Sequence, residues 1–188
     1  MVEFAILGLL HEAPMHGYEL RKRLADLLGA FRAFSYGSLY PALKRLQRAG
    51  LIEEETTSAD PPEDRAAARS WGRRARKVYQ LTPHGKERFA VLLADGGPQT
   101  WDDDGFGVHM AFFSRTSAEV RMRILEGRRR RVEERREGLR SALARAGEQI
   151  DRYTRELHRM GLESSEREVR WLNELIEHER SEQLGHEQ

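Results

Sequence analysis

The sequence contains no cysteine, which excludes disulfide scaffolds, thiol catalysis and zinc sites with cysteine ligands. Long apolar runs are also missing. The longest run near the N-terminus, Phe4 to Leu10, is far shorter than the roughly 20 residues that a transmembrane helix needs. No basic segment precedes it and no small-residue cleavage site follows it, so we expect no signal peptide. The sequence therefore predicts a cytoplasmic protein with no membrane partner.

Motifs of the common enzyme classes are missing as well. The chain has no glycine-rich phosphate loop, no His-Glu-x-x-His zinc motif and no Gly-x-Ser-x-Gly nucleophile elbow. Asp102, Asp103, Asp104 and His109 offer metal-ligand atoms, but consecutive loop carboxylates do not converge on one ion, so a solvated acidic loop is the favoured interpretation. The sequence predicts no enzymatic activity, no catalytic residue, no metal site and no cofactor.

Charged residues, by contrast, are in excess. They make up 34% of the 188 residues, compared with about 25% in an average globular domain. Such a surplus suits long solvated helices better than one compact globule. Residues 1–90 hold 15 basic and 11 acidic side chains, whereas residues 91–188 hold 17 and 20. The N-terminal half is therefore the better candidate for a polyanionic partner.

Glycine, proline and aspartate mark a boundary between two domains. The segment Asp95-Gly96-Gly97-Pro98 is followed within a few residues by Asp102-Asp103-Asp104-Gly105, a composition that is typical of a connecting segment. We expect a first domain over residues 1–94, a linker over 95–107 and a second domain over 108–188.

The first domain has the pattern of three helices, a two-stranded ribbon and a fourth helix. Apolar residues at helical spacing predict the three helices, around residues 4–10, 20–28 and 39–46. His16-Gly17-Tyr18 is expected to open the second of these, with Tyr18 packed beneath it. Gly50 is a suitable stop for the third. Strands are predicted over Leu51–Thr57 and Lys77–Leu81, and Thr82-Pro83 is expected to open the last helix. This order is that of a winged helix-turn-helix.

The third helix has one apolar and one basic face. At 100° per residue, Leu39, Leu43 and Leu46 share the inward face with Ala42. Lys44 and Arg48 lie opposite, near Pro41, and Arg45 and Tyr40 flank them. Pro41 fits the first helical turn if Gly37 or Ser38 is the N-cap. A basic helix with an apolar back can enter a DNA major groove. The alternative is an ordinary solvated basic face.

Basic residues also gather at the end of the segment between the two strands, namely Arg73, Arg74, Arg76 and Lys77. A basic loop at the tip of a ribbon is the physical form of a wing that contacts phosphates. The alternative interpretation is a disordered polar loop.

The second half is predicted to be helical. Eight apolar residues recur at spacings of three, four or seven, an a/d heptad pattern: Val132, Leu139, Leu143, Ala146, Ile150, Tyr153, Leu157 and Met160. We expect the break in this helix at Gly161–Ser165, with Ser165 as the N-cap of a final helix. Two long helices with a short turn can pair with each other or with a second subunit. The predicted dimer interface comprises Leu139, Leu143, Ile150, Tyr153, Leu157, Trp171 and Leu175.

Two segments carry a family resemblance. Gly37-Ser38-Leu39-Tyr40-Pro41-Ala42-Leu43 and Arg76-Lys77-Val78-Tyr79-Gln80-Leu81-Thr82-Pro83-His84-Gly85 resemble motifs of the PadR family of bacterial transcriptional regulators. The resemblance covers residues 4 to about 93. It implies a homodimeric winged helix-turn-helix repressor with a helical C-terminal dimerisation region. The family's short wing is lengthened here by Pro61–Gly72. The predicted DNA-binding residues are Tyr36, Ser38, Tyr40, Lys44, Arg45, Arg48, Arg73, Arg74, Arg76 and Lys77.

Large apolar side chains cluster after the domain boundary, at Trp101, Phe106, Met110, Phe112 and Phe113. The family resemblance implies that effectors bind near the dimer interface beside aromatic residues, so these five are candidates for an effector pocket. The alternative is a plain core, because aromatic clusters usually serve packing.

The sequence thus predicts a mainly α-helical chain with a small β-hairpin wing. Its predicted function is sequence-specific binding of double-stranded DNA at a palindromic operator, as a homodimeric repressor that a small-molecule effector relieves. The alternative function is a non-catalytic protein-interaction scaffold that uses the winged domain and the helical hairpin.

Overall fold

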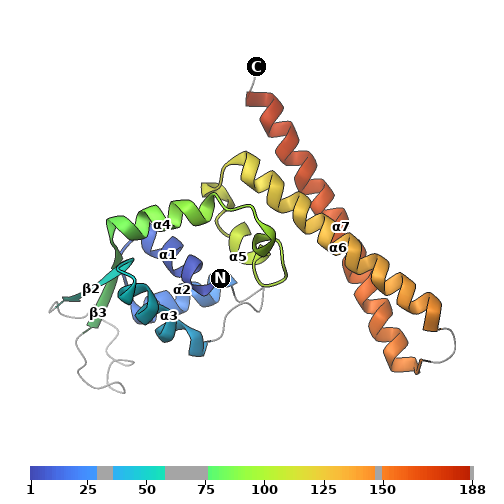
Figure 1. The fold of residues 1–188 in the computed structure, drawn as a ribbon, viewed down its shortest axis with the longest axis horizontal. Helices are drawn as coiled ribbons and strands as arrows, with labels where there is room; N and C mark the ends of the chain where they lie inside the picture. Colours follow the sequence, from blue (N-terminus) through green and yellow to red (C-terminus); the bar gives the residue numbers. More distant parts are fainter. Residues whose placement is uncertain (29–35, 58–75, 147–149, 187–188) are drawn as a thin grey trace. The chain divides into compact units, whose positions relative to one another are not determined.

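The computed structural model describes residues 1–28, 36–57, 76–146 and 150–186. The chain divides into two compact units, Met1–Leu93 and Ala94–Gln188. Each unit has its own hydrophobic core, and we describe each by itself (Figure 1).

The first unit combines four helices with a small sheet. In chain order the elements are α1 (Val2–Glu12), β1 (Met15–His16), α2 (Gly17–Leu28), α3 (Tyr36–Arg48), β2 (Ile52–Thr57), β3 (Arg76–Leu81) and α4 (Pro83–Leu93). The sheet order is β1-β3-β2, and β3 pairs antiparallel with both neighbours. The predicted winged helix-turn-helix is confirmed. The two-residue strand β1 was not predicted, because so short a strand has no periodicity to detect.

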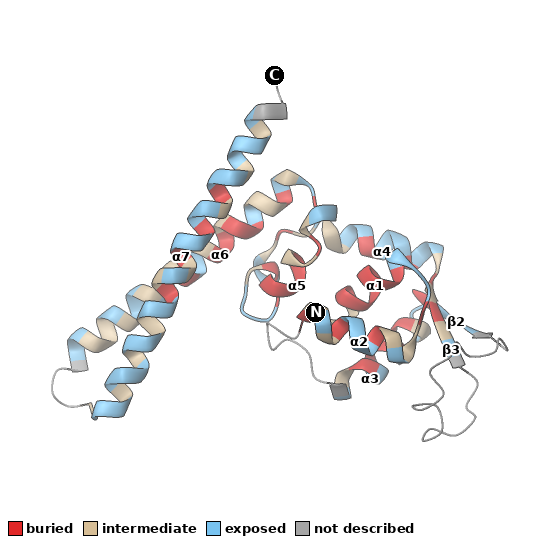
Figure 2. Cartoon of the chain, turned by 180° about the vertical axis from the view of Figure 1, so that it is seen from behind, coloured by how far each residue is buried: buried red, intermediate tan, exposed pale blue. Residues whose placement is uncertain are grey.

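Helix α1 lies at the centre of this unit. All seven residues from Phe4 to Leu10 are buried, so Figure 2 shows the middle of this helix as continuous red. The helix contacts α2, α3, α4 and β3, which together surround it. A helix that is apolar on all sides belongs in a core, and this one supports the three helices around it.

The ends of α3 and α4 follow specific capping rules. Gly50, at φ 68°, ends α3: its N–H donates to the Gln47 carbonyl at 3.0 Å and the Leu51 N–H donates to the Leu46 carbonyl at 3.0 Å. This pair of bonds is a Schellman motif, and the positive φ favours glycine. Thr82 caps α4, because its Oγ1 accepts from the Gly85 N–H at 3.0 Å. These caps fix the direction of α3 relative to the β2–β3 ribbon.

Two local expectations in this unit were wrong. Helix α3 begins at Tyr36, so Pro41 lies in its interior rather than in its first turn. Tyr18 is 74% exposed and is not packed beneath α2. The buried residues of α2 are Leu20, Leu24 and Leu28. A residue two positions from Leu20 is rotated by about 200° and therefore faces away from the core.

The second unit is a long helical hairpin with a short irregular segment before it. Its elements are η2 (Pro98–Thr100), α5 (Phe106–Met110), η3 (Phe113–Arg115), α6 (Ala118–Ala146) and α7 (Arg152–His186). Helices α6 and α7 contact each other along their length (Figure 1). Residues 95–107, predicted as a linker, are part of this compact unit. Within the described segments, no helix is long and apolar enough to cross a bilayer.

The break between the two long helices is not where the sequence analysis placed it. Helix α7 runs without interruption through Gly161 and Ser165, and the Ser165 hydroxyl donates to the Gly161 carbonyl at 2.8 Å. A Cβ on Gly161 would lie 3.2 Å from Leu139 Cδ1, so the missing side chain of Gly161 permits close packing of α6 on α7 at this point. The N-terminus of α7 is capped instead by Asp151, which accepts from the Tyr153 and Thr154 N–H groups at 2.8 and 3.1 Å.

Candidate nucleic-acid interface

Helix α3 presents the two faces that its sequence predicts. Leu39, Ala42, Leu43 and Leu46 are no more than 1% exposed. On the other side, the exposed side chains are those of Tyr40, Lys44, Arg45 and Arg48. Ser38 is half-buried. Because the leucines hold the helix from behind, its basic face is available to a partner without unfolding the domain.

The cations on this face differ in their surroundings. Arg45 donates from Nε to Glu3 Oε1 on α1 at 2.6 Å, and both side chains are exposed. Within the described residues, Lys44 and Arg48 have no carboxylate within ion-pair distance. Their charges are therefore free to meet an anion, whereas the charge of Arg45 is partly balanced.

Lys77, near the end of the ribbon that leads into the segment 58–75, is bound to a neighbouring strand. Its Nζ lies 2.7 Å from Glu54 Oε1 on β2, and Gln47 on α3 donates to the other oxygen of Glu54 at 3.1 Å. The hydrogen bond from Lys77 holds the pKa of Glu54 below its ordinary value, and the same bond raises the pKa of Lys77. Glu54 therefore links the end of α3 to β3, and Lys77 must leave or share this carboxylate to contact a phosphate.

The remaining predicted DNA contacts lie outside the described residues or have undescribed side chains. Arg73, Arg74 and the long wing segment Pro61–Gly72 belong to residues 58–75, which the structure does not describe. Tyr36 and Arg76 lie within α3 and β3, but their side chains are not described. Their proposed contact with DNA stays a prediction.

The acidic partners, Glu3 and Glu54, were not predicted from the sequence. Glu3 lies on α1 and Glu54 on β2, and only the fold brings them close to the cations of α3 and β3. These two carboxylates can be recognised as partners of the cations only from the packing of α1 on α3 and the pairing of β2 with β3.

The five aromatic and apolar residues proposed for an effector pocket contribute mainly to packing. Phe106 and Phe112 are buried, and Met110 and Phe113 pack against the core of the hairpin. The ring of Phe106 meets Trp171 edge-on at 6.2 Å. Trp101 differs, because it is half-buried beside a surface recess lined also by Gly127, Arg130, Arg131 and Glu134. An effector role for these residues stays a prediction.

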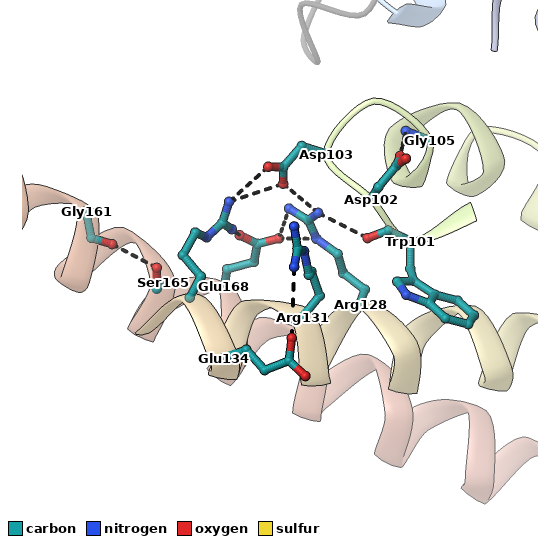
Figure 3. Close-up of polar contacts among 11 residues, drawn as sticks. Trp101, Asp102, Asp103, Gly105, Arg128, Arg131, Glu134, Gly161, Ser165 and Glu168 are labelled. Atoms are coloured by element: carbon teal, nitrogen blue, oxygen red, sulfur yellow. Dashed lines mark hydrogen bonds and ion pairs between the residues drawn. The ribbon is translucent and has the colours of Figure 1, made fainter. Parts of the chain in front are cut away.

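Asp103 is not the freely solvated carboxylate that we expected but part of an ion-pair network (Figure 3). It lies 2.7 Å from Arg128 Nη1 and 3.1 Å from Arg135 Nη1. Both arginines also reach Glu168 on α7, at 2.6 and 3.1 Å. Partial burial raises the pKa of Asp103, but the two guanidinium groups outweigh it and the pKa is lowered. Among the described residues, no group of three His, Asp or Glu side chains is placed to hold a metal ion.

The residues predicted for a dimer interface are unequally exposed in the single chain. Leu139, Leu143, Ile150 and Leu175 are half-buried. Trp171, Leu157 and Tyr153 are 38%, 60% and 83% exposed, and Met160 near them is 60% exposed. The hairpin therefore covers one part of the apolar pattern and leaves another part on its surface.

The chain is similar to known proteins over part or most of its length. Residues 6–91 match the transcriptional regulator PadR-like family. The negative transcriptional regulator PadR of Bacillus subtilis (strain 168) is 30% identical over 87 residues, which are 46% of this chain and 42% of that protein. The chain thus matches less than half the length of this curated relative.

Two crystal structures of Bacillus subtilis PadR are similar over most of both chains. The complex with operator DNA is 22% identical and covers 94% of this chain and 98% of that one, with a TM-score of 0.41. The complex with p-coumaric acid is 21% identical and covers 95% and 98%, also with a TM-score of 0.41. The family match coincides with the winged helix of unit 1. Residues 6–91, the winged-helix part of unit 1, thus resemble the PadR-like family of transcriptional regulators.

Proposed function

We propose that the protein is a sequence-specific DNA-binding repressor that acts as a homodimer in the cytoplasm. The observation that carries this proposal is the basic face of α3, with Lys44 and Arg48 exposed above a fully buried leucine face. It lies within the domain that matches the regulator family. In winged helix-turn-helix domains, such a helix reads base edges in the major groove.

In the proposed mechanism, three parts of the chain have separate roles in DNA binding. Helix α3 enters the major groove, and the ribbon places Lys77 and the basic end of the wing beside neighbouring phosphates. The helical hairpin holds two copies at the spacing of two half-sites, which favours a palindromic operator. A small-molecule effector that binds the second unit relieves repression.

Removing Lys44 or Arg48 should weaken DNA binding without unfolding the protein. Each alanine variant should lose about 1–3 kcal/mol of operator binding if the side chain reads a base edge, with relaxed preference at one position. The loss should be uniform across sequences if it contacts a phosphate. Gel shifts and a salt series on operator and random duplexes measure both effects.

Lys86→Ala is the matched control, because Lys86 is an exposed lysine on α4, which lies across α1 from α3 (Figure 1). It should bind DNA as the wild type does. Operator binding that survives the combined loss of Lys44 and Arg48 would contradict the proposal. It would then favour the alternative function, a protein-interaction scaffold.

Leu157→Asp should convert the proposed dimer to a monomer. The side chain is 60% exposed in the single chain, so the substitution costs the hairpin little. A dimer that covers this side chain would bury the new carboxylate, at a cost of several kcal/mol. Light scattering should report a monomer, and operator binding should weaken. The adjacent, exposed Glu156→Ala is the control and should stay dimeric. A dimeric Leu157→Asp variant would place the interface elsewhere.

A further inference from the structure

Arg45 is held at one end only of its guanidinium group. Its Nε donates to Glu3 Oε1 at 2.6 Å, and within the described residues its Nη1 and Nη2 atoms have no partner. Glu3 lies in the first turn of α1 and Arg45 in the last turns of α3. The pair thus joins the central helix of the domain to the proposed recognition helix.

This single bond restricts how Arg45 can bind a partner. A guanidinium is planar and offers two forks of donors, one from Nη1 and Nη2 and one from Nε and an Nη. A carboxylate on Nε occupies the second fork and leaves the first free. The free fork can still donate in parallel to O6 and N7 of a guanine.

The other cations of the proposed interface whose side chains the structure describes lack this arrangement. Within the described residues, Lys44 and Arg48 have no carboxylate partner. Lys77 has Glu54, but an ammonium is a compact point charge without a planar fork, so a carboxylate cannot orient it in the same way.

We propose that Glu3 is a positioning residue that sets the operator specificity of Arg45. It fixes the plane of the guanidinium so that the Nη fork faces a guanine edge, and its negative charge opposes loose contact with phosphates. This inference rests on the proposed DNA-binding function. Glu3 itself need not touch DNA.

Two substitutions of Glu3 separate positioning from charge. The side-chain carbonyl of Glu3→Gln can still accept from Arg45 Nε, whereas Glu3→Ala has no acceptor. Both remove the negative charge, and this loss alone should tighten binding to the operator and to a random duplex by the same few-fold factor, which leaves their ratio unchanged. Only Glu3→Ala should lower the ratio of operator to random-duplex affinity, by about tenfold, which corresponds to one well-made bidentate contact.

The experiment first selects an operator from a random duplex library with the wild-type protein. Wild type, Glu3→Gln, Glu3→Ala, Arg45→Ala and the double variant Glu3→Ala/Arg45→Ala are then titrated against that operator and a random duplex. Thermal unfolding is measured alongside to confirm that each variant is folded. Repeating the selection with Glu3→Ala should show relaxed preference at one base position, and Glu3→Ala should have no further effect on specificity once Arg45 is removed.

Equal affinity ratios for Glu3→Gln and Glu3→Ala would show that Glu3 acts only as a charge and would overturn the inference. An effect of Glu3→Ala that persists in the Arg45→Ala background would also overturn it. Lys44→Ala distinguishes these failures from failure of the proposed function. Suppose that Lys44→Ala weakens operator binding while the Glu3 variants leave the ratio of operator to random-duplex affinity unchanged. The proposed DNA-binding function would then be supported, and the positioning role of Glu3 would be contradicted.

Discussion

Replacing Gly85 with alanine is expected to destabilise the first unit by about 3 kcal/mol, the upper end of the usual cost of overpacking. Gly85 is buried near the start of α4, and an added Cβ would lie 1.9 Å from the Leu51 carbonyl oxygen and 3.0 Å from Leu81 Cδ2. The carbonyl cannot easily yield, because it accepts from the Thr82 N–H at 3.2 Å. Helix α4 would have to move off the ribbon.

The matched control is Gly138→Ala. Gly138 lies within α6, is exposed, and has nothing within 4 Å of the position where a Cβ would be added. Alanine there should stabilise the helix by about 0.5–1 kcal/mol, because glycine loses more backbone entropy in a helix. Urea denaturation followed by circular dichroism measures both variants. A Gly85→Ala protein as stable as the wild type would contradict the docking of α4 described above.

Arg128→Ala should destabilise the second unit by about 2–3 kcal/mol, because Glu168 Oε1 and the Trp101 carbonyl would lose the partner they have in a buried guanidinium, whereas Arg135 would still bind Asp103 and Glu168 Oε2. The Arg128 side chain is only 9% exposed and contacts Asp103, Glu168 and the Trp101 carbonyl. Its guanidinium carbon also lies 5.2 Å from the centre of the Phe106 ring. The substitution removes these contacts together and weakens the attachment of the segment before α5 to the hairpin, which Arg135 still maintains through Asp103.

Arg140→Ala is the control for this experiment. Arg140 also joins α6 to α7, through Glu166 at 2.8 Å, but its side chain is 45% exposed. An exposed ion pair of this kind contributes no more than about 1 kcal/mol. The difference between the two variants in thermal unfolding therefore measures the effect of burial. Equal losses of stability would mean that the Arg128 network is no stronger than a surface pair.

The features that the sequence predicted correctly are those with a local cause. The leucine face of α3 follows from helical spacing alone, and Thr82-Pro83 opens α4 because threonine caps a helix and proline tolerates its first turn. The glycine that ends α3 is likewise a property of one position, since Gly50 adopts a positive φ.

The features that the sequence did not predict depend on partners far along the chain. The apolar spacing of three and four continues from α6 across Asp151 into α7, so periodicity alone could not show the turn. Gly161 and Ser165 suggested a break, yet Gly161 lies close to Leu139 of α6 and the Ser165 hydroxyl bonds the Gly161 carbonyl within α7. Glu3 and Glu54 were overlooked as partners because their cations are 42 and 23 positions away in the sequence.

The apolar core of the hairpin has a consequence for how this unit assembles. Its buried residues closest to the turn along the chain are Val132 on α6 and Val169 on α7, and others reach Val120 and Ile176. Between Leu139 and Met160, no apolar side chain among the described residues is buried. If α6 and α7 paired progressively from the turn, the first steps would therefore bury little apolar surface and contribute little free energy of folding. Because the entropy of closing a chain segment grows only with the logarithm of its length, α6 and α7 can form separately and then dock at their remote ends.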